Sequence, residues 1–399
     1  MKSLKKTTLA SLVGAAALAT AGAANATIVV GGENGYEFSV DGNINQFFVS
    51  TDSDNADDNV NEVRNGLLPT FFGFNVSAPE VNGLKIGARV SISPSTNGTS
   101  YVSGGDNNAL EQREAFATID GSFGQILAGK ALGLYGSHNI LTEQTLYGVG
   151  YGTTGNGQTT LGGIGFGYDY ADWRSQLRWT SPDMNGFKVA FAVVDPAGPG
   201  IANLAGAGPT GPIGSSADSE DLRYEADLSY AGAFDNGSYM LWLSGMMQDQ
   251  DDLAEDKQAW TVGSTLKISG FEFMAQYSDS EDATGGSAAS TCLVTGGCNG
   301  TAFGATIPAT ASTELEWNQY VVQAGYRFAG TTLVSANYSE LENDSPGVGS
   351  DDTAERITLG VYHDVNANLK LVAEYTKVEH DNEDQLEADI FALGGFVTW

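Results

Sequence analysis

From about residue 37 onward, apolar and polar side chains alternate along the chain in segments of about ten residues. In the stretch FKVAFAVV, Phe187, Val189, Phe191 and Val193 fall on one face, and Lys188 falls on the other. A period of two is the pattern of a β-strand with one apolar and one polar face. The stretches YEADLSY, YVVQAGYRF and LKLVAEYT alternate in the same way. The pattern predicts an all-β fold.

Sixteen segments of this kind follow one another. They span residues 37–49, 64–77, 84–93, 112–120, 124–133, 173–181, 187–195, 221–231, 237–248, 258–268, 271–279, 317–328, 331–340, 355–363, 369–379 and 388–399. No helical pattern separates them, so we expect neighbouring segments to pair as antiparallel strands.

The connections between these segments alternate in length. Short ones, such as 79–83, 181–186 and 269–270, contain Gly, Asn, Asp or Pro and are typical of tight turns, whereas 134–172 and 280–316 are long. Short turns on one side and long loops on the other are typical of a transmembrane β-barrel, with periplasmic turns and extracellular loops. A soluble β-sandwich also alternates, but it packs its apolar faces together and seldom has this many long strands. The sequence therefore predicts an antiparallel 16-stranded transmembrane barrel.

Composition agrees with this interpretation. With 41% hydrophobic and 17% charged residues, the chain is not of the disordered class, despite its net charge of −31. The acidic balance excludes a basic nucleic-acid-binding surface, so no nucleic acid is expected as a partner. After Ala26 no run of about 20 apolar residues offers a transmembrane helix.

The N-terminus predicts export. MKSLKK supplies three lysines, an apolar run covers residues 9–24, and Ala24-Asn25-Ala26 resembles a cleavage site. An anchoring helix is the alternative, but the run is short and contains glycine. We expect residues 1–26 to be a cleaved secretory signal peptide and residues 27–399 to form a single barrel domain.

The two cysteines, Cys292 and Cys298, lie in one predicted loop. In an exported protein they favour a small disulfide loop. A metal site would need further ligands, and no histidine lies near them in the sequence. No metal and no cofactor are predicted.

Four stretches carry a family resemblance. They are FFGFNVSAPEVNGLKIGARV (71–90), REAFATIDGSFGQILAGK (113–130), WRSQLRWTSPDMNGFKVAFAV (173–193) and EADIFALGGFVTW (387–399). In order and spacing they resemble the general diffusion porins of Gram-negative proteobacteria, and the resemblance covers the whole exported chain. The third stretch is the most specific match.

The resemblance implies a homotrimer in the outer membrane of a Gram-negative bacterium, with the third loop, 134–172, folded into the lumen. It implies a water-filled channel for passive diffusion of ions and small hydrophilic solutes. It also implies contacts with outer-membrane lipids, with lipopolysaccharide and with the outer-membrane assembly machinery.

The resemblance further implies a constriction where acidic groups on that loop face a basic wall. The basic wall residues carried over are Arg89, Arg113, Arg174 and Arg178. The acidic loop residues are Glu143, Asp169 and Asp172. The sequence departs from the family pattern at two points: the P-E-F-G-G-type loop motif is absent, and Phe71 stands where the family usually has Arg.

The chain ends in an apolar strand. Phe391, Leu393, Val397 and Trp399 share one face at a period of two, and we expect this strand to pair with the first one. In the resembled family a terminal aromatic residue is also the signal that the assembly machinery reads.

Other functions remain as alternatives. A solute-specific outer-membrane channel differs from a general one in its neck, which sequence does not place. A barrel enzyme is less favoured, because the chain has three histidines, His138, His363 and His380, and no G-x-S-x-G motif. A secreted adhesin is a third alternative. We expect no enzyme activity.

Overall fold

The structure is a computed structural model that describes residues 28–53, 60–94, 96–97, 110–152, 159–195, 222–249, 256–281, 316–344, 352–381 and 387–399. Within these ranges it contains nineteen strands of one sheet. The strands are β1 (Ile28–Gly31), β2 (Glu37–Ser53), β3 (Val60–Arg64), β4 (Phe71–Ser77), β5 (Lys85–Pro94), β6 (Leu110–Glu111), β7 (Ala115–Gly121), β8 (Gly124–Leu132), β9 (Trp173–Thr180), β10 (Phe187–Val194), β11 (Arg223–Phe234), β12 (Gly237–Gln248), β13 (Lys257–Ile268), β14 (Phe271–Glu281), β15 (Glu316–Phe328), β16 (Thr332–Asn343), β17 (Asp352–Asn366), β18 (Leu369–His380) and β19 (Ala388–Thr398). Two short helices, α1 (Ser137–Thr142) and η2 (Gln144–Tyr147), lie between β8 and β9.

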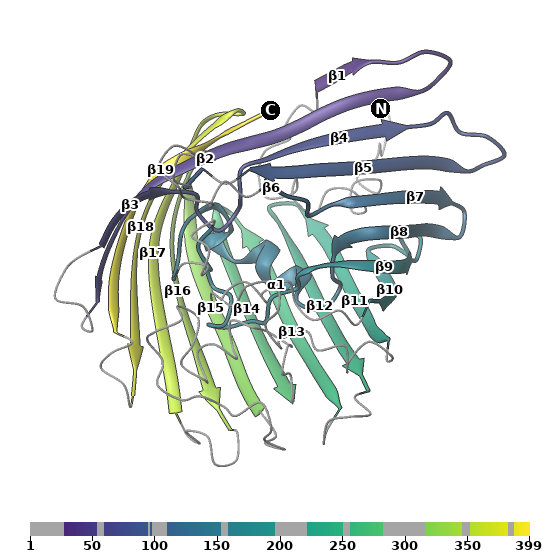
Figure 1. Ribbon diagram of the computed structural model, residues 1–399. Helices are drawn as coiled ribbons and strands as arrows, with labels where there is room; N and C mark the ends of the chain where they lie inside the picture. The colour runs from purple at the N-terminus through teal and green to yellow at the C-terminus, as the bar shows by residue number, and fades with distance from the viewer. Residues whose placement is uncertain are drawn as a thin grey trace.

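The sheet closes on itself. Neighbouring strands pair antiparallel in chain order, and β19 pairs with β2, from Thr398 opposite Asn43 to Ala388 opposite Ser53. Figure 1 shows the resulting ring of strands, coloured from purple to yellow. Counting β3 with β4 and β6 with β7 as interrupted strands, and leaving out β1, the described residues form a ring of sixteen strands. The predicted antiparallel 16-stranded barrel is confirmed.

The strand predicted over residues 64–77 is interrupted in the structure. Segment 64–77 was expected to be continuous, but β3 pairs with the second half of β2 and β4 with the first half, and residues 65–70 leave the wall. Pro69 has no N–H to give to a ladder, and Leu67 and Leu68 are buried in the interior. Segment 112–120 likewise starts late, at β7, after the two-residue β6.

Strand β1 was not predicted. It pairs with β2 from Ile28 opposite Val40, next to the position where β19 ends. It therefore continues the edge of β2 beyond the last strand, outside the ring of sixteen.

The two faces of the ring differ as the alternation predicts. On β10, Phe187, Phe191 and Val193 are exposed outward, whereas Ala190 and Ala192 are buried inside. Because lipid surrounds such a barrel and water fills it, apolar side chains outside and polar ones inside are the stable arrangement. Among the described residues, no helix has both the length and the apolar character to cross a membrane.

Tight turns join every second pair of strands. The chain passes from β13 to β14 through Ser269 and Gly270 alone, whose φ angles are 51° and 91°. Positive φ at both positions is the geometry that matches the twist of a two-residue hairpin. The alternation of short and long connections is present in the structure, as predicted.

Candidate functional site

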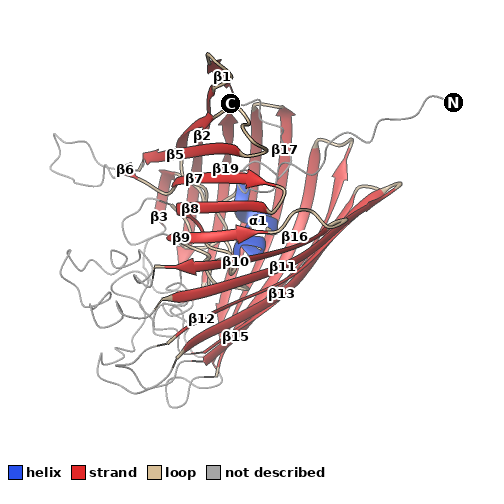
Figure 2. Cartoon of the chain, turned by 90° about the vertical axis from the view of Figure 1, so that its right-hand side faces the viewer, coloured by secondary structure: helices blue, strands red, loops and turns tan. Residues whose placement is uncertain are grey.

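The segment between β8 and β9 lies inside the ring. Its described residues, 133–152 and 159–172, are called the lumen loop below, and they include α1 and η2. Figures 1 and 2 both show α1 surrounded by strands. Tyr135, Phe166 and Tyr168 of the loop are fully buried. The loop therefore occupies part of the lumen, where the resemblance placed it.

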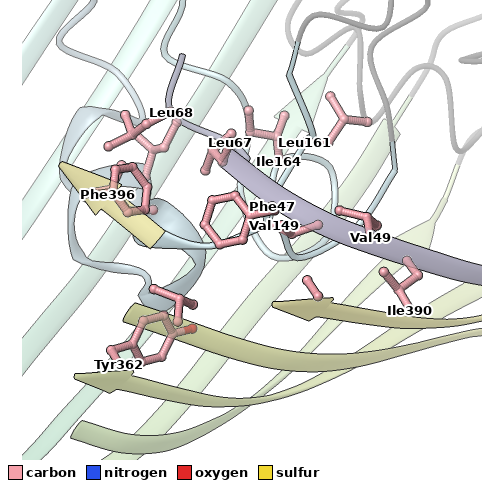
Figure 3. Packing of buried hydrophobic residues seen from close by; sticks show 14 of the residues in the cluster. Phe47, Val49, Leu67, Leu68, Val149, Leu161, Ile164, Tyr362, Ile390 and Phe396 are labelled. Carbon is pink, nitrogen blue, oxygen red and sulfur yellow. The ribbon is translucent and has the colours of Figure 1, made fainter. Parts of the chain in front are cut away.

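An apolar cluster packs the loop against one side of the wall (Figure 3). The wall contributes inward-facing residues of β2, β16, β17, β18 and β19. The principal members are Phe47, Val49, Leu333, Tyr362, Val372, Ile390 and Phe396 from the wall, and Ile140, Leu146, Val149, Leu161 and Ile164 from the loop. Burial of each such side chain contributes about 1.5–3 kcal/mol. Packing therefore holds the loop against this part of the wall.

Two wall carboxylates bind the loop through its backbone. Glu374 Oε2 on β18 accepts hydrogen bonds from Val149 N at 2.6 Å and Gly150 N at 3.0 Å. Glu225 on β11 accepts similarly from Leu134 N at 2.6 Å. Both glutamates are buried. They anchor the loop at two points, one on each side of α1 in the sequence.

The predicted acidic residues of the loop face the wall. Asp169 is fully buried and accepts hydrogen bonds from Tyr135 Oη at 2.6 Å, Gln319 Nε2 at 2.7 Å and Trp317 Nε1 at 3.1 Å. These partners place Asp169 in a network with β15. Its oxygens are occupied by donors from the wall and from the loop itself.

Glu143 and Asp172 also lie beside wall residues. Glu143 contacts Asn337 on β16 and lies 3.5 Å from Arg356 Nη2 on β17. Asp172 Oδ2 lies 3.5 Å from Arg174 Nη2 at the exit of the loop. The structure thus brings the three predicted acids into contact with three different parts of the ring rather than into one row.

Arg89, the first predicted basic residue, lies on the inner face of β5. Its guanidinium pairs with Asp41 Oδ1 at 2.7 Å and with Glu114 Oε2 at 2.7 Å. The ring of Phe71 lies beneath it, 5.9 Å from the ring centroid to the guanidinium carbon. Phe71, which stands where the resembled family usually has Arg, therefore contacts Arg89.

The other predicted arginines lie on β9 and just before β7. Arg174 and Arg178 share the inner face of β9, and Arg178 Nη1 donates to the Leu132 carbonyl at 3.4 Å. Within the described ranges no carboxylate forms an ion pair with Arg178. Arg113, just before β7, pairs with Glu111 at 2.9 Å.

Three further buried arginines lie in the lumen and were missed by the sequence reasoning. Arg356 Nη1 donates to the Gly162 carbonyl at 2.8 Å, and Arg64 Nη2 donates to the Thr159 carbonyl at 2.9 Å. Arg223 pairs with Glu225 at 2.7 Å. Arg223 stands two residues before Glu225, so the alternation of YEADLSY, extended by one residue, was a signal that could have found it.

Two loop tyrosines keep their protons. Burial raises the pKa of Tyr151 to about 12, and burial together with the nearby Asp364 carboxylate raises that of Tyr147 to about 12. The ammonium group of Lys370 lies over the Tyr147 ring, 5.2 Å from its centroid. At neutral pH both hydroxyls are therefore uncharged in the lumen.

The remaining sequence-predicted positions lie away from the loop. Phe391, Leu393 and Val397 are exposed on the outer face of β19. Trp399 N donates to the Gly42 carbonyl at 3.1 Å, and its ring lies 5.0 Å from that of Phe72. Cys292 and Cys298 lie outside the described residues. Among the described residues, no group of three or more His, Cys, Asp or Glu side chains could hold a metal ion.

Comparison with known proteins gives one family. A family model described as Gram-negative porin matches residues 11–383. No curated protein matches the sequence.

Solved structures share the fold at low identity. The anion-selective porin from Comamonas acidovorans is 15% identical, with 91% of this chain and 100% of that chain covered and a TM-score of 0.62. Salmonella typhi OmpF in complex with daunomycin is 15% identical, with 92% and 98% covered and a TM-score of 0.63. The trimer form of in-vitro folded OmpT of Vibrio cholerae is 13% identical, with 92% and 100% covered and a TM-score of 0.52.

Proposed function

Because the chain belongs to the Gram-negative porin family, we propose that its outer-membrane channel is narrowed where the lumen loop faces the wall that carries Arg89, Arg174 and Arg178. The protein is an outer-membrane channel for the diffusion of small solutes. The main support for a narrowed channel is that Glu225 and Glu374 hold the buried lumen loop inside the ring.

Passage through this channel is passive. A barrel of sixteen strands leaves an aqueous lumen, and a loop fixed within it screens solutes by size. Charged side chains at the narrow part then act on ions and dipolar solutes. The family and the fold favour a channel over an enzyme, and we propose that no catalytic step accompanies passage.

The net charge at the narrow part of the channel depends on which charged side chains are paired with each other. The loop acids are engaged with the wall, and Arg89 is held between two carboxylates. Arg178 has no ion pair among the described residues. The carboxylates of Glu225 and Asp227 that act on it also face Arg223 and His138, so its positive charge is less neutralised than that of Arg89. We propose Arg178 as the basic residue with the strongest effect on ion preference.

The channel is proposed to act as a homotrimer. The trimer form of the Vibrio cholerae protein supports this assembly for the shared fold. Cross-linking of the detergent-purified protein should give a ladder that ends at three copies. A single band at one copy would exclude the trimer.

The export and assembly features complete the proposal. Residues 1–26 act as the cleaved signal and 27–399 as the barrel, which sequencing of the exported protein's N-terminus tests. The outer apolar band contacts outer-membrane lipids and lipopolysaccharide. The strand face with Phe391, Leu393, Val397 and Trp399 serves the assembly machinery, and Cys292 and Cys298 form a disulfide.

Uptake by liposomes tests the channel. Vesicles that contain the purified protein should swell in isotonic monosaccharide solution faster than in solutions of longer sugars. A folded protein that leaves all vesicles as tight as protein-free ones would overturn the proposed function.

A further inference from the structure

Residues 65–70, the inner segment below, leave the barrel wall and enter the lumen. They interrupt the strand that β3 and β4 otherwise form. All six residues are buried, with Leu67 at 5% and Leu68 at 8% exposure. Breaking a barrel strand gives up ladder hydrogen bonds, which lipid does not replace. The inner segment therefore requires compensating contacts inside the ring.

Two asparagines of β2 provide part of the compensation. Asn45 Oδ1 accepts from Gly66 N at 3.0 Å, and Asn45 Nδ2 donates to the Leu68 carbonyl at 2.9 Å. Asn43 Nδ2 donates to the Pro69 carbonyl at 3.2 Å. These side-chain hydrogen bonds replace the backbone hydrogen bonds that residues 66, 68 and 69 would make inside the barrel wall. The inner segment is therefore held in a defined path and not merely displaced.

A further set of contacts joins the inner segment to the lumen loop. Leu67 N donates to the Gly148 carbonyl at 2.9 Å, and Thr160 N donates to the Gly66 carbonyl at 3.2 Å. Leu67 and Leu68 belong to the same apolar cluster as Val149 of the loop (Figure 3). The inner segment is thus bonded to the loop at residues on both sides of the undescribed stretch 153–158.

Gly66 permits this close approach. A Cβ atom added at Gly66 would lie 2.1 Å from the Gly148 carbonyl oxygen and 2.9 Å from the Phe47 ring. The first contact is with backbone, which cannot turn aside as a flexible side chain can. Any other residue at this position would force the two backbones apart.

We propose that the inner segment positions the lumen loop and thereby helps to set the width of the channel. This inference rests on the proposed channel function. In this arrangement the loop is held from two sides, by the wall carboxylates Glu225 and Glu374 and by the inner segment. The loop and the inner segment then narrow the lumen together.

Two variants test the proposal. Gly66→Ala separates the two backbones, and Leu67→Ala removes apolar packing without touching a hydrogen bond. Leu127→Ala on β8 is the matched control, because Leu127 is equally buried but lies outside the apolar cluster. For each variant, a difference in SDS-gel migration between unheated and heated samples shows that the protein is folded. The separate variant Leu67→Met nearly conserves the volume of the side chain and should behave like the wild type.

The readouts are single-channel conductance and the ratio of disaccharide to monosaccharide permeability. Both Gly66→Ala and Leu67→Ala should raise the ratio. In Leu67→Ala the channel should also spend at least about tenfold more time at a second conductance level than in the wild type, because a buried leucine is truncated. The ratio does not depend on how much protein folds. Folded variants with the ratio and conductance of wild type, or a change as large in Leu127→Ala, would overturn the inference. A wild-type protein that does not conduct would instead overturn the channel function itself.

Discussion

Replacing Glu374 should loosen the lumen loop. Its carboxylate is buried and accepts two loop N–H groups, from Val149 and Gly150, as well as the Tyr362 hydroxyl. In Glu374→Leu the volume is kept but these donors lose their acceptor. Each buried donor left unpaired costs about 1–3 kcal/mol, so the two backbone groups alone cost about 2–6 kcal/mol.

That cost predicts a measurable change in the channel. A penalty of about 2 kcal/mol, the lower end, favours loop arrangements that expose these groups to water by about 30-fold. Single-channel recordings of Glu374→Leu should therefore show frequent transitions to a second conductance level. Glu374→Gln retains an acceptor oxygen toward the loop and should stay close to wild type.

The control uses a carboxylate elsewhere in the lumen. Glu272 on β14 pairs with Lys267 and Arg327 and contacts no loop residue among those described. Glu272→Gln should leave the number of conductance levels unchanged. If Glu374→Leu, in folded form, gives the same single level as wild type, the loop does not depend on this anchor and the reasoning is refuted.

Two other predictions concern charge and the C-terminus. In Arg178→Gln, the reversal potential in a KCl gradient should shift toward cation preference, by about threefold in the permeability ratio, because a unit charge about 6 Å away in water contributes about 0.7 kcal/mol. Arg113→Gln should shift the reversal potential less, since Glu111 already neutralises Arg113. An equal shift in the two variants would contradict the role assigned to Arg178. Deleting Trp399 removes the backbone pair with Gly42 and the contact with Phe72. It should reduce outer-membrane yield more than the conductance of inserted channels, and an unchanged yield would argue against the assembly signal.

The barrel could be predicted because its pattern is local. Each strand lies between lipid and lumen, so every second residue reports on its own surroundings. The same alternation puts Arg174 and Arg178 on one face of their strand, and Phe391 and Leu393 on one face of theirs. Closure followed from the apolar strand at the end of the chain.

The inner segment could not be predicted in the same way. In the stretch NGLLPT, Leu67 and Leu68 fit a strand that faces lipid about as well as a segment that turns inward. The difference lies in contacts with Val149 and Leu161, which are distant in the sequence. Gly66 and Pro69 were signals of a break that the alternation on either side concealed.

The anchors of the lumen loop were missed for a related reason. Glu374 and Val149 are 225 residues apart, and Arg356 and Gly162 are 194 apart. Nothing in the local sequence pairs them. The predicted loop acids were found at the loop, but their partners, such as Gln319 and Trp317, come from the wall.

The conductance of the purified wild-type protein in a planar lipid bilayer tests the central claim most directly. The account predicts stepwise increases in current as single assemblies insert, with a stable level that an inward, anchored loop maintains. Folded protein that inserts into the bilayer and carries no current would contradict it.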